Sequence, residues 1–303
     1  MFRWLPQALA GEEEAVHQMR VAGRRLRVGL ALLTGKPKGR RVRRATHVLR
    51  ELGRAAGASR DLDVSVDLFG ERLKSQGSLS QEQTVLRQRL RAARRRSRAR
   101  MAEALLDLEI ARLRSDLRAI LSHRADDPFR IFRRVRDARD EEGRALLAGF
   151  EAIGDRYDPD GLHRLRGLTR RLRYTAEVDD ALRGRDSEAP ALLKRMQGQV
   201  GLVHDNHVLA AWLEAQAVAA ARGKASLATE AELQAAFFEE AGRACHRAFL
   251  EQRPLELIRR ALEAMGQARS AAVGSHDARH TAPVAPASDG TMTFPLRSRS
   301  DAS

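Results

Sequence analysis

Residues 16–27 read VHQMRVAGRRLR, and residues 162–173 read LHRLRGLTRRLR. Both segments place a histidine second, an arginine three positions later and the string RRLR at the end. Residues 57–64, GASRDLDV, and residues 201–208, GLVHDNHV, form a second matching pair in the same order along the chain. Motifs that recur together at nearly constant spacing are the mark of an internal repeat. The sequence therefore predicts two copies of one structural unit.

The motifs, and most of the chain around them, have the pattern of α-helices. Ala, Leu, Arg and Glu dominate, and apolar residues recur at spacings of three and four, as at Leu86, Leu90 and Ala93. No run of alternating β-branched residues predicts a strand. We therefore expect an all-α fold.

Clusters of glycine and proline set the expected helix boundaries. Breaks at 35–39, near Gly53 and Gly57, at 75–80 and at 126–128 divide the first half into about four helices. In the second half we expect helices at 162–184, 192–200, 205–221 and 229–268. We assign one domain to residues 8–270, with a first repeat at about 12–127, a connecting helix at about 129–155 and a second repeat at about 156–270. Residues 271–303 are rich in Ala, Ser and Pro, which predicts a disordered tail.

The spacing of the arginines gives each motif helix a basic side. An α-helix turns by about 100° per residue, so side chains three and four positions apart share a face. Four positions in each motif thus form one basic stripe beside an apolar face. They are His17, Arg20, Arg24 and Arg27 in the first motif and His163, Arg166, Arg170 and Arg173 in the second. By the same geometry, Arg25 and Arg171 point away from the stripes.

The charge of the chain favours a polyanionic partner. The 303 residues include 55 Lys plus Arg against 40 Asp plus Glu, a formal net charge of +15, and 50 of the basic residues are arginines. Like charges three and four apart on a helix destabilise it by about 0.2–0.5 kcal/mol per pair. A sequence that keeps this arrangement twice indicates a bound polyanion that offsets the repulsion. Arginine suits phosphate because its planar guanidinium offers a fork of donors and keeps its charge.

These paired motifs resemble those of the CHAD family, the conserved histidine α-helical domain. The resemblance covers approximately residues 15–268 and rests on both motif pairs occurring in order in both halves. It implies two four-helix bundles related by a pseudo-twofold axis around a central basic cavity. It also implies binding of inorganic polyphosphate and association with polyphosphate granules, without a known catalytic activity.

The resemblance implies a set of ligand-facing residues, carried over position by position. The implied polyphosphate-binding residues are His17, Arg20, Arg24, Arg27, Arg60, His163, Arg166, Arg170, Arg173 and His204. We interpret Asp61 and Asp205, each directly after a basic residue, as helix N-caps or as positioners of arginine. His207 stands where the first repeat has Asp63, so the two sides of the cavity need not be equivalent.

No catalytic signature accompanies the basic stripes. The chain contains no P-loop, no HExxH, no Arg-His-Gly phosphatase signature and no ExExK strand of the triphosphate hydrolase domain that some CHAD proteins carry. His204 and His207 have a spacing that could suit a metal, but HxxH alone is a weak signal. We therefore expect a non-catalytic binding module with no cofactor and no metal ligands.

The same composition places the protein in a reducing compartment. Cys245 is the one cysteine, so neither an internal disulfide nor a Cys-rich zinc site is expected. The N-terminal residues lack the apolar run of a signal peptide, and no stretch approaches the roughly 18 apolar residues of a membrane span. We expect a cytoplasmic protein without membrane contact, located at polyphosphate granules as the resemblance implies.

Two further basic clusters, at 40–47 and at 87–100, lie outside the stripes. The first could extend the site, whereas the second is spread around its helix, as in a solvated or nonspecific polyanion-binding surface. The high net charge leaves nonspecific nucleic-acid binding as the alternative function. An aromatic content of 4% and the lack of a recognisable DNA- or RNA-binding motif give base stacking little to work with.

Overall fold

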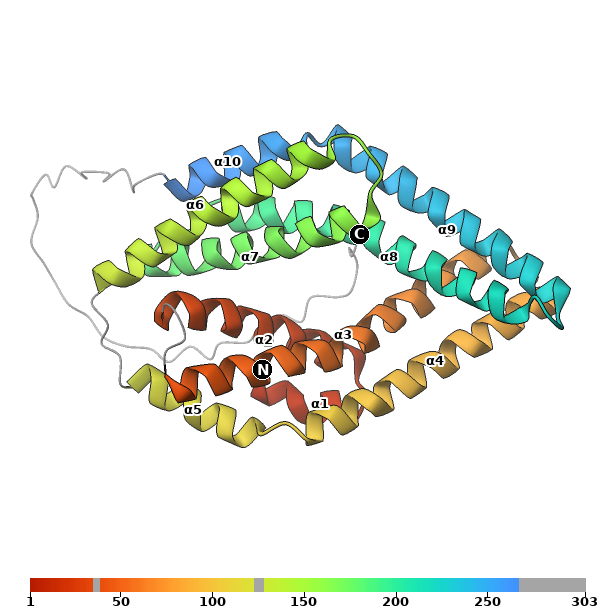
Figure 1. Cartoon of the computed structure of the whole chain (residues 1–303), viewed down its shortest axis with the longest axis horizontal. Helices are drawn as coiled ribbons and strands as arrows, with labels where there is room; N and C mark the ends of the chain where they lie inside the picture. Colours follow the sequence, from red (N-terminus) through yellow and green to blue (C-terminus); the bar gives the residue numbers. More distant parts are fainter. Residues whose placement is uncertain (35–38, 123–127, 267–303) are drawn as a thin grey trace, which may run out of the picture. The chain divides into compact units, whose positions relative to one another are not determined.

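The computed structural model describes residues 1–34, 39–122 and 128–266, and within them it contains helices and no strands (Figure 1). The all-α prediction is therefore confirmed. After a short 3-10 turn, Phe2–Trp4, the helices are α1 (Leu5–Leu9), α2 (Glu13–Thr34), α3 (Arg40–Ser75), α4 (Gln81–Leu106), α5 (Ile110–Ser122), α6 (Pro128–Ile153), α7 (Pro159–Arg183), α8 (Ala189–Ala220), α9 (Ala225–Glu251) and α10 (Pro254–Gly266).

Two sets of four helices pack in the same order. In the first set α3 packs against α2, α4 and α5, and in the second α8 packs against α7, α9 and α10. Helices of equal rank also meet between the sets, because α2 contacts α7, α3 contacts α8 and α4 contacts α9. This order is what a duplicated unit produces. The pseudo-twofold axis and the repeat boundaries stay predictions.

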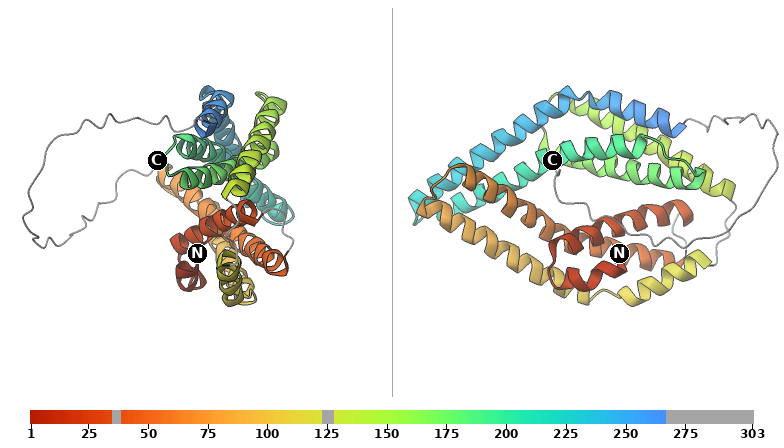
Figure 2. Two further views of the ribbon diagram at one scale, coloured as in Figure 1. Left: turned by 90° about the vertical axis from the view of Figure 1, so that its left-hand side faces the viewer. Right: turned by 180° about the vertical axis from the view of Figure 1, so that it is seen from behind.

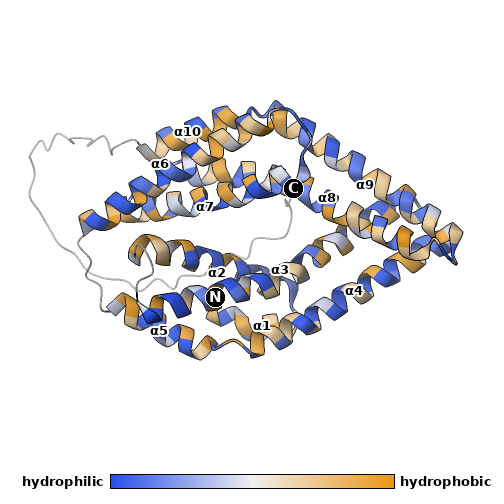
Figure 3. Ribbon diagram, in the orientation of Figure 1, coloured by the Kyte–Doolittle hydropathy of each residue, from blue (hydrophilic) through white to orange (hydrophobic). Residues whose placement is uncertain are grey.

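Amphipathic helices account for the packing. Hydrophobic and hydrophilic residues are interspersed along each helix in Figure 3, as expected for helices with one buried side. Phe69 and Leu86 from the first set join Leu209, Leu213 and Phe238 from the second in one shared hydrophobic core. This core lies where α3, α4, α8 and α9 converge at one end of the domain (Figures 1 and 2). The other ends of the two sets have cores of their own.

Three predicted helix boundaries are wrong. Gly53 and Gly57 lie inside α3, which runs unbroken, and 200–205 lies inside α8. Glycine weakens a helix by about 1 kcal/mol relative to alanine, and the packing of α3 against four other helices outweighs that cost. The predicted helix at 229–268 instead ends at Glu251, and α10 begins at Pro254 after Arg253, whose φ of 52° is left-handed. A further break separates α4 from α5 after Leu106.

The predicted connecting helix corresponds to α6, which packs on α7, α10 and α2. Glycine allows the close approach to α7, since a Cβ on Gly149 would lie 2.4 Å from a methyl carbon of Leu165. The predicted tail at 271–303 lies outside the described residues. No helix among those described is both long and apolar enough to cross a membrane.

Candidate functional site

The two predicted basic stripes face each other across the contact between α2 and α7. Burial, followed by the nearby charges of Arg24 and Arg166, lowers the pKa of Arg170 to about 9. Burial and Arg166 likewise lower the pKa of Arg24, although the nearby Tyr174 opposes the change. Guanidinium groups from both halves of the chain therefore lie close together.

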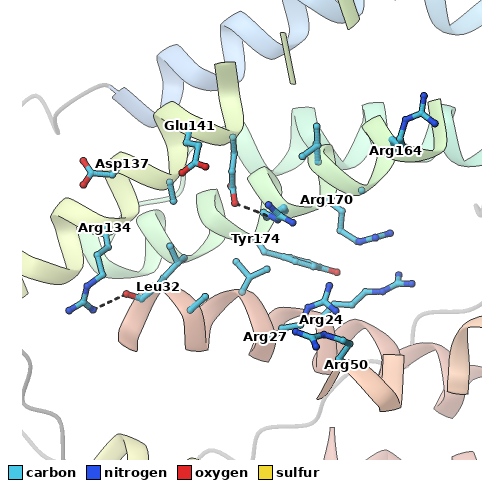
Figure 4. A pocket seen from close by; sticks show the side chains of 17 residues that line it. Arg24, Arg27, Leu32, Arg50, Arg134, Asp137, Glu141, Arg164, Arg170 and Tyr174 are labelled. Carbon is cyan, nitrogen blue, oxygen red and sulfur yellow. Dashed lines mark hydrogen bonds and ion pairs between the residues drawn. The ribbon is translucent and has the colours of Figure 1, made fainter. Parts of the chain in front are cut away.

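A cavity of about 960 Å³ opens beside this cluster, between α2, α3, α6 and α7 (Figure 4). Its wall holds seven arginines, three carboxylates and Tyr174. The arginines are Arg24, Arg27, Arg50, Arg134, Arg164, Arg170 and Arg171, and the carboxylates are Asp137, Glu141 and Glu142. In Figure 4 Arg170 and Tyr174 on α7 face Arg24 on α2. Three of the ten predicted ligand residues, Arg24, Arg27 and Arg170, line this cavity.

Four arginines of the stripes are not compensated by an ion pair. Within the described residues Arg24, Arg27, Arg166 and Arg170 make neither an ion pair nor a hydrogen bond. Burial lowers the pKa of Arg27, and the charges of Arg171 and Arg50 add to that effect. Uncompensated guanidinium groups held close together attract an anion.

Arg20 differs from these four because the protein itself satisfies it. The residue is only 7% exposed, and its Nη1 donates to the carbonyl oxygens of Ala56 at 2.8 Å and Gly57 at 2.7 Å on α3. Asp61 lies 4.0 Å away. Burial, followed by the charge of Arg24, lowers the pKa of Arg20 to about 10. Arg20 thus fastens α2 to α3.

Arg166 occupies the equivalent place on α7 but has no such bonds. It lies over Gly201 on α8, where a Cβ would be 3.4 Å from both Nε and Nη2. Its Nε is buried and has no hydrogen-bond partner among the described residues. Gly201 therefore leaves room for Arg166 against α8, whereas a Cβ on Gly57 would meet nothing within 4 Å. Of the two arginines, only Arg20 is bonded to the helix that it lies against.

The residues of the second motif pair also make different contacts in the two repeats. Arg60 forms an ion pair with Glu13 at the start of α2. His204, its counterpart, instead meets His163, with 3.0 Å between their Nδ1 atoms, so one ring donates and the other accepts. Burial, His163 and Arg166 lower the pKa of His204 to about 3, and burial with Arg166 lowers that of His163. Both rings are therefore neutral at physiological pH.

His17 and the two aspartates complete the cluster. Burial and the charge of Arg60 lower the pKa of His17. Asp61 and Asp205 lie in the interiors of α3 and α8, so their interpretation as N-caps is wrong. Asp61, 4.0 Å from Arg20, fits the other interpretation, a positioner of arginine. Burial raises the pKa of Asp205, while the charge of Arg166 opposes the rise.

Arg173 is turned into the protein and does not line the cavity. It is 8% exposed, lies 3.9 Å from Glu177 and stacks over the ring of Tyr174 at 4.7 Å. Glu177 also accepts two hydrogen bonds from Arg25 on α2, at 2.7 and 2.9 Å. These residues tie α2 to α7 at the edge of the cavity. A contact of Arg173 with ligand stays a prediction that this geometry does not favour.

Several cavity residues have no counterpart in the predicted set. Arg171 was expected to point away, yet it lines the cavity 3.8 Å from Glu142, because α6 covers that side of α7. Arg134 on α6 donates to the carbonyl oxygens of Leu32 and Leu33 at the end of α2. Nothing in the repeated motifs identifies Arg134, since α6 lies between the repeats.

The carboxylates of α6 give the cavity an acidic wall. Glu142 is 9% exposed and accepts a hydrogen bond from Thr175 at 2.8 Å. Burial raises its pKa to about 7, against the smaller opposing effects of Thr175 and Arg171. The cavity is therefore not uniformly basic, whereas the family resemblance implied a basic cavity.

Some basic residues outside the stripes link helices. Arg98 donates two hydrogen bonds to the buried Asp63, and Arg94 lies 3.6 Å from the same carboxylate. In the cluster at 40–47, Arg44 forms a bidentate ion pair with Asp116 on α5. Both clusters therefore contain structural arginines, and in the cluster at 87–100 these lie beside exposed ones such as Arg91 and Arg95.

The histidines of the HxxH segment point to different neighbours. His204 meets His163, whereas His207 lies 3.8 Å from Glu239 on α9. Across the described ranges no group of three or more His, Cys, Asp or Glu side chains is arranged to hold a metal ion.

The comparisons with known proteins agree with this architecture. The family model of the CHAD domain matches residues 1–214, so the chain belongs to the CHAD family. The crystal structure of the CHAD domain from the plant Ricinus communis superposes with a TM-score of 0.58 over 86% of each chain at 23% identity, which shows a shared fold.

Two curated relatives are longer proteins. Uncharacterized proteins from two strains of Mycobacterium tuberculosis are each 31% identical over 191 residues, which is 59% of this chain and 36% of theirs. The chain therefore spans about a third of the length of these relatives.

Proposed function

We propose that this CHAD domain binds inorganic polyphosphate along the facing arginines of α2 and α7 and catalyses no reaction. The observation that carries the proposal is a group of four arginines that make no ion pair and no hydrogen bond in the described chain, Arg24, Arg27, Arg166 and Arg170. Their repulsion raises the free energy of the ligand-free protein, and a chain of phosphates removes it.

The chemistry of the site favours a chain of phosphates over an isolated anion. A guanidinium binds two oxygens of one phosphate at a time, so several neighbouring arginines need several phosphates. The cavity, at about 960 Å³, holds far more than one phosphate group. Polyphosphate supplies closely spaced charges on a thin, flexible chain that can follow the arginines inward.

The acidic wall on α6 supports the same ligand over duplex DNA. Asp137 and Glu141 repel a polyanion, and they confine it to the side formed by α2 and α7. A rigid duplex cannot place its phosphates along one wall of a cavity of this size. Binding at polyphosphate granules in the cytoplasm would follow from the same contacts, as part of this proposal.

The test compares two triple variants with the same change in charge. Arg24, Arg166 and Arg170 are replaced by alanine in one. Arg91, Arg95 and Arg100 on α4, which are exposed and make no ion pair within the described part of the chain, are replaced in the other. Binding of long-chain polyphosphate, duplex DNA and pyrophosphate is measured by titration calorimetry at fixed salt.

We expect the first variant to lose at least about a hundredfold in polyphosphate affinity, since charged hydrogen bonds contribute about 1.5–3 kcal/mol each. The control should lose less than about tenfold, and circular dichroism should show equal helicity. Equal losses in both variants would mean that net charge alone drives binding. Equal affinity for pyrophosphate and long chains would contradict the extended site.

A further inference from the structure

A second, smaller cavity lies away from the arginine stripes, between α4 of the first helix set and α8 of the second. Its volume is about 280 Å³, and its lining consists of Arg89, Ala92, Ala93 and Arg96 from α4 with Trp212 and Gln216 from α8. None of these residues lines the larger cavity. The polyphosphate proposal uses none of them.

The spacing of the lining residues explains the hollow. Arg89 and Arg96 are seven positions apart, so they lie on one face of α4, two turns from each other, with Ala92 and Ala93 between them. Two methyl side chains leave space where longer ones would fill it. Across that space, Trp212 is partly buried and packs against the shared core, so the indole forms a wall supported from behind.

The lining offers three kinds of contact at once. The indole is a flat surface for stacking a planar ring, and the two guanidinium groups attract phosphate. Gln216 has an amide that can pair with polar ring edges, and its Oε1 already accepts a hydrogen bond from Arg89 at 3.2 Å. In contrast to the larger cavity, this lining includes no carboxylate. An anion that carries a flat, polar ring could make all three kinds of contact.

We propose that this cavity binds a nucleotide unit, with its base stacked on Trp212 and its phosphate on Arg89 and Arg96. A cavity of about 280 Å³ fits one ring system better than a long phosphate chain. The unit could belong to a free mononucleotide or to a single-stranded nucleic acid, whose neighbouring phosphates would reach the exposed Arg95 on the same helix. This site is independent of the proposed polyphosphate function.

Fluorescence of Trp212 tests the proposal directly. The chain has two tryptophans, so Trp4→Phe leaves Trp212 as the one reporter. AMP, a short oligodeoxyadenylate, ribose 5-phosphate and long-chain polyphosphate are titrated separately, with excitation at the red edge of the indole band, where adenine does not absorb. Oligonucleotide binding to the unsubstituted chain is measured in parallel by anisotropy of a labelled strand.

We expect the oligodeoxyadenylate, AMP or both to quench Trp212, and ribose 5-phosphate and polyphosphate to leave it unchanged. A response to AMP identifies a free nucleotide as sufficient, and a response to the strand alone identifies a single-stranded nucleic acid as the source. Ala93→Leu fills the hollow with a good helix former and should weaken binding about tenfold, as the loss of one stacked base does.

The stripe variant lacking Arg24, Arg166 and Arg170 should keep its nucleotide response, so failure of the polyphosphate proposal leaves this one standing. The absence of quenching by both nucleotide ligands overturns the proposal, and so does equal quenching by ribose 5-phosphate. Unchanged strand binding in Ala93→Leu overturns it as well, because the hollow would then play no part.

Discussion

Replacing Arg20 or Arg166 with methionine should give opposite results, although the two residues are equivalent in the repeats. Arg20 makes two hydrogen bonds to backbone carbonyls, and a bond from a charged donor contributes about 1.5–3 kcal/mol. Against this gain, the fall in its pKa to about 10 corresponds to a cost of about 3 kcal/mol. Arg20→Met should therefore lower the free energy of unfolding by up to about 3 kcal/mol.

Arg166 has no bonds to lose. Its buried Nε lacks a partner, and an unsatisfied buried donor costs about 1–3 kcal/mol. Arg166→Met keeps a long side chain over Gly201 and should leave stability unchanged or raise it by about 1 kcal/mol. The same substitution should weaken polyphosphate binding about tenfold or more, because Arg166 is one of the four uncompensated arginines.

The assay measures both properties on both variants. Thermal unfolding followed by circular dichroism reports stability, and about 1 kcal/mol corresponds to a change of roughly 2–4 °C in Tm for a domain of this size. Anisotropy of labelled polyphosphate reports affinity at fixed salt and pH. The reasoning is refuted if Arg166→Met destabilises the protein as much as Arg20→Met, or if Arg166→Met binds polyphosphate as tightly as the unsubstituted chain.

Three other outcomes can be measured with the same assays. Polyphosphate should raise the lowered pKa values of His163 and His204, so its affinity should be constant above their bound-state pKa values and increase as pH falls through those values. The double variant His163→Gln, His204→Gln should show a flatter pH dependence. Affinity should fall steeply between about 50 and 500 mM salt, as counterion release requires, and salt-independent binding would exclude contact through the stripes. Glu142→Gln should raise the free energy of unfolding by about 1–3 kcal/mol near pH 8 and change it little near pH 4; equal effects at both pH values would contradict the reasoning. The folded-state pKa of Glu142, about 7, lies above the unfolded value, so ionisation of this carboxyl group disfavours folding as pH rises through that interval.

The basic stripes could be predicted because they depend on one helix at a time. Helical periodicity places Arg20 and Arg24 on one side of α2, and the repeat identifies Arg166 and Arg170 as their counterparts. Their meeting across α2 and α7 depends on tertiary packing, which the family resemblance supplied and periodicity alone could not. The helix break predicted at Gly53 and Gly57 was wrong because the packing of α3 outweighed the low helix propensity of glycine.

The rest of the site depends on contacts that have no signal in the motifs. The acidic wall belongs to α6, which has no repeated motif to compare. Arg20 and Arg166 look alike in sequence, yet one has carbonyl partners on α3 and the other has none on α8. Arg173 matches Arg27 in the repeat, and the local pairing with Glu177 and Tyr174 turns it inward.

The unequal use of matching positions bears on how the two halves evolve. After a duplication, both copies of a motif begin under the same selection. Here Arg20 is bonded to α3 and Arg166 makes no bond to α8, and Arg60 pairs with Glu13 whereas His204 meets His163. Selection at position 20 should therefore act through folding, and selection at position 166 through the proposed ligand. Positions that carry the same residue in both halves can thus come to serve different purposes, one in stability and the other in binding.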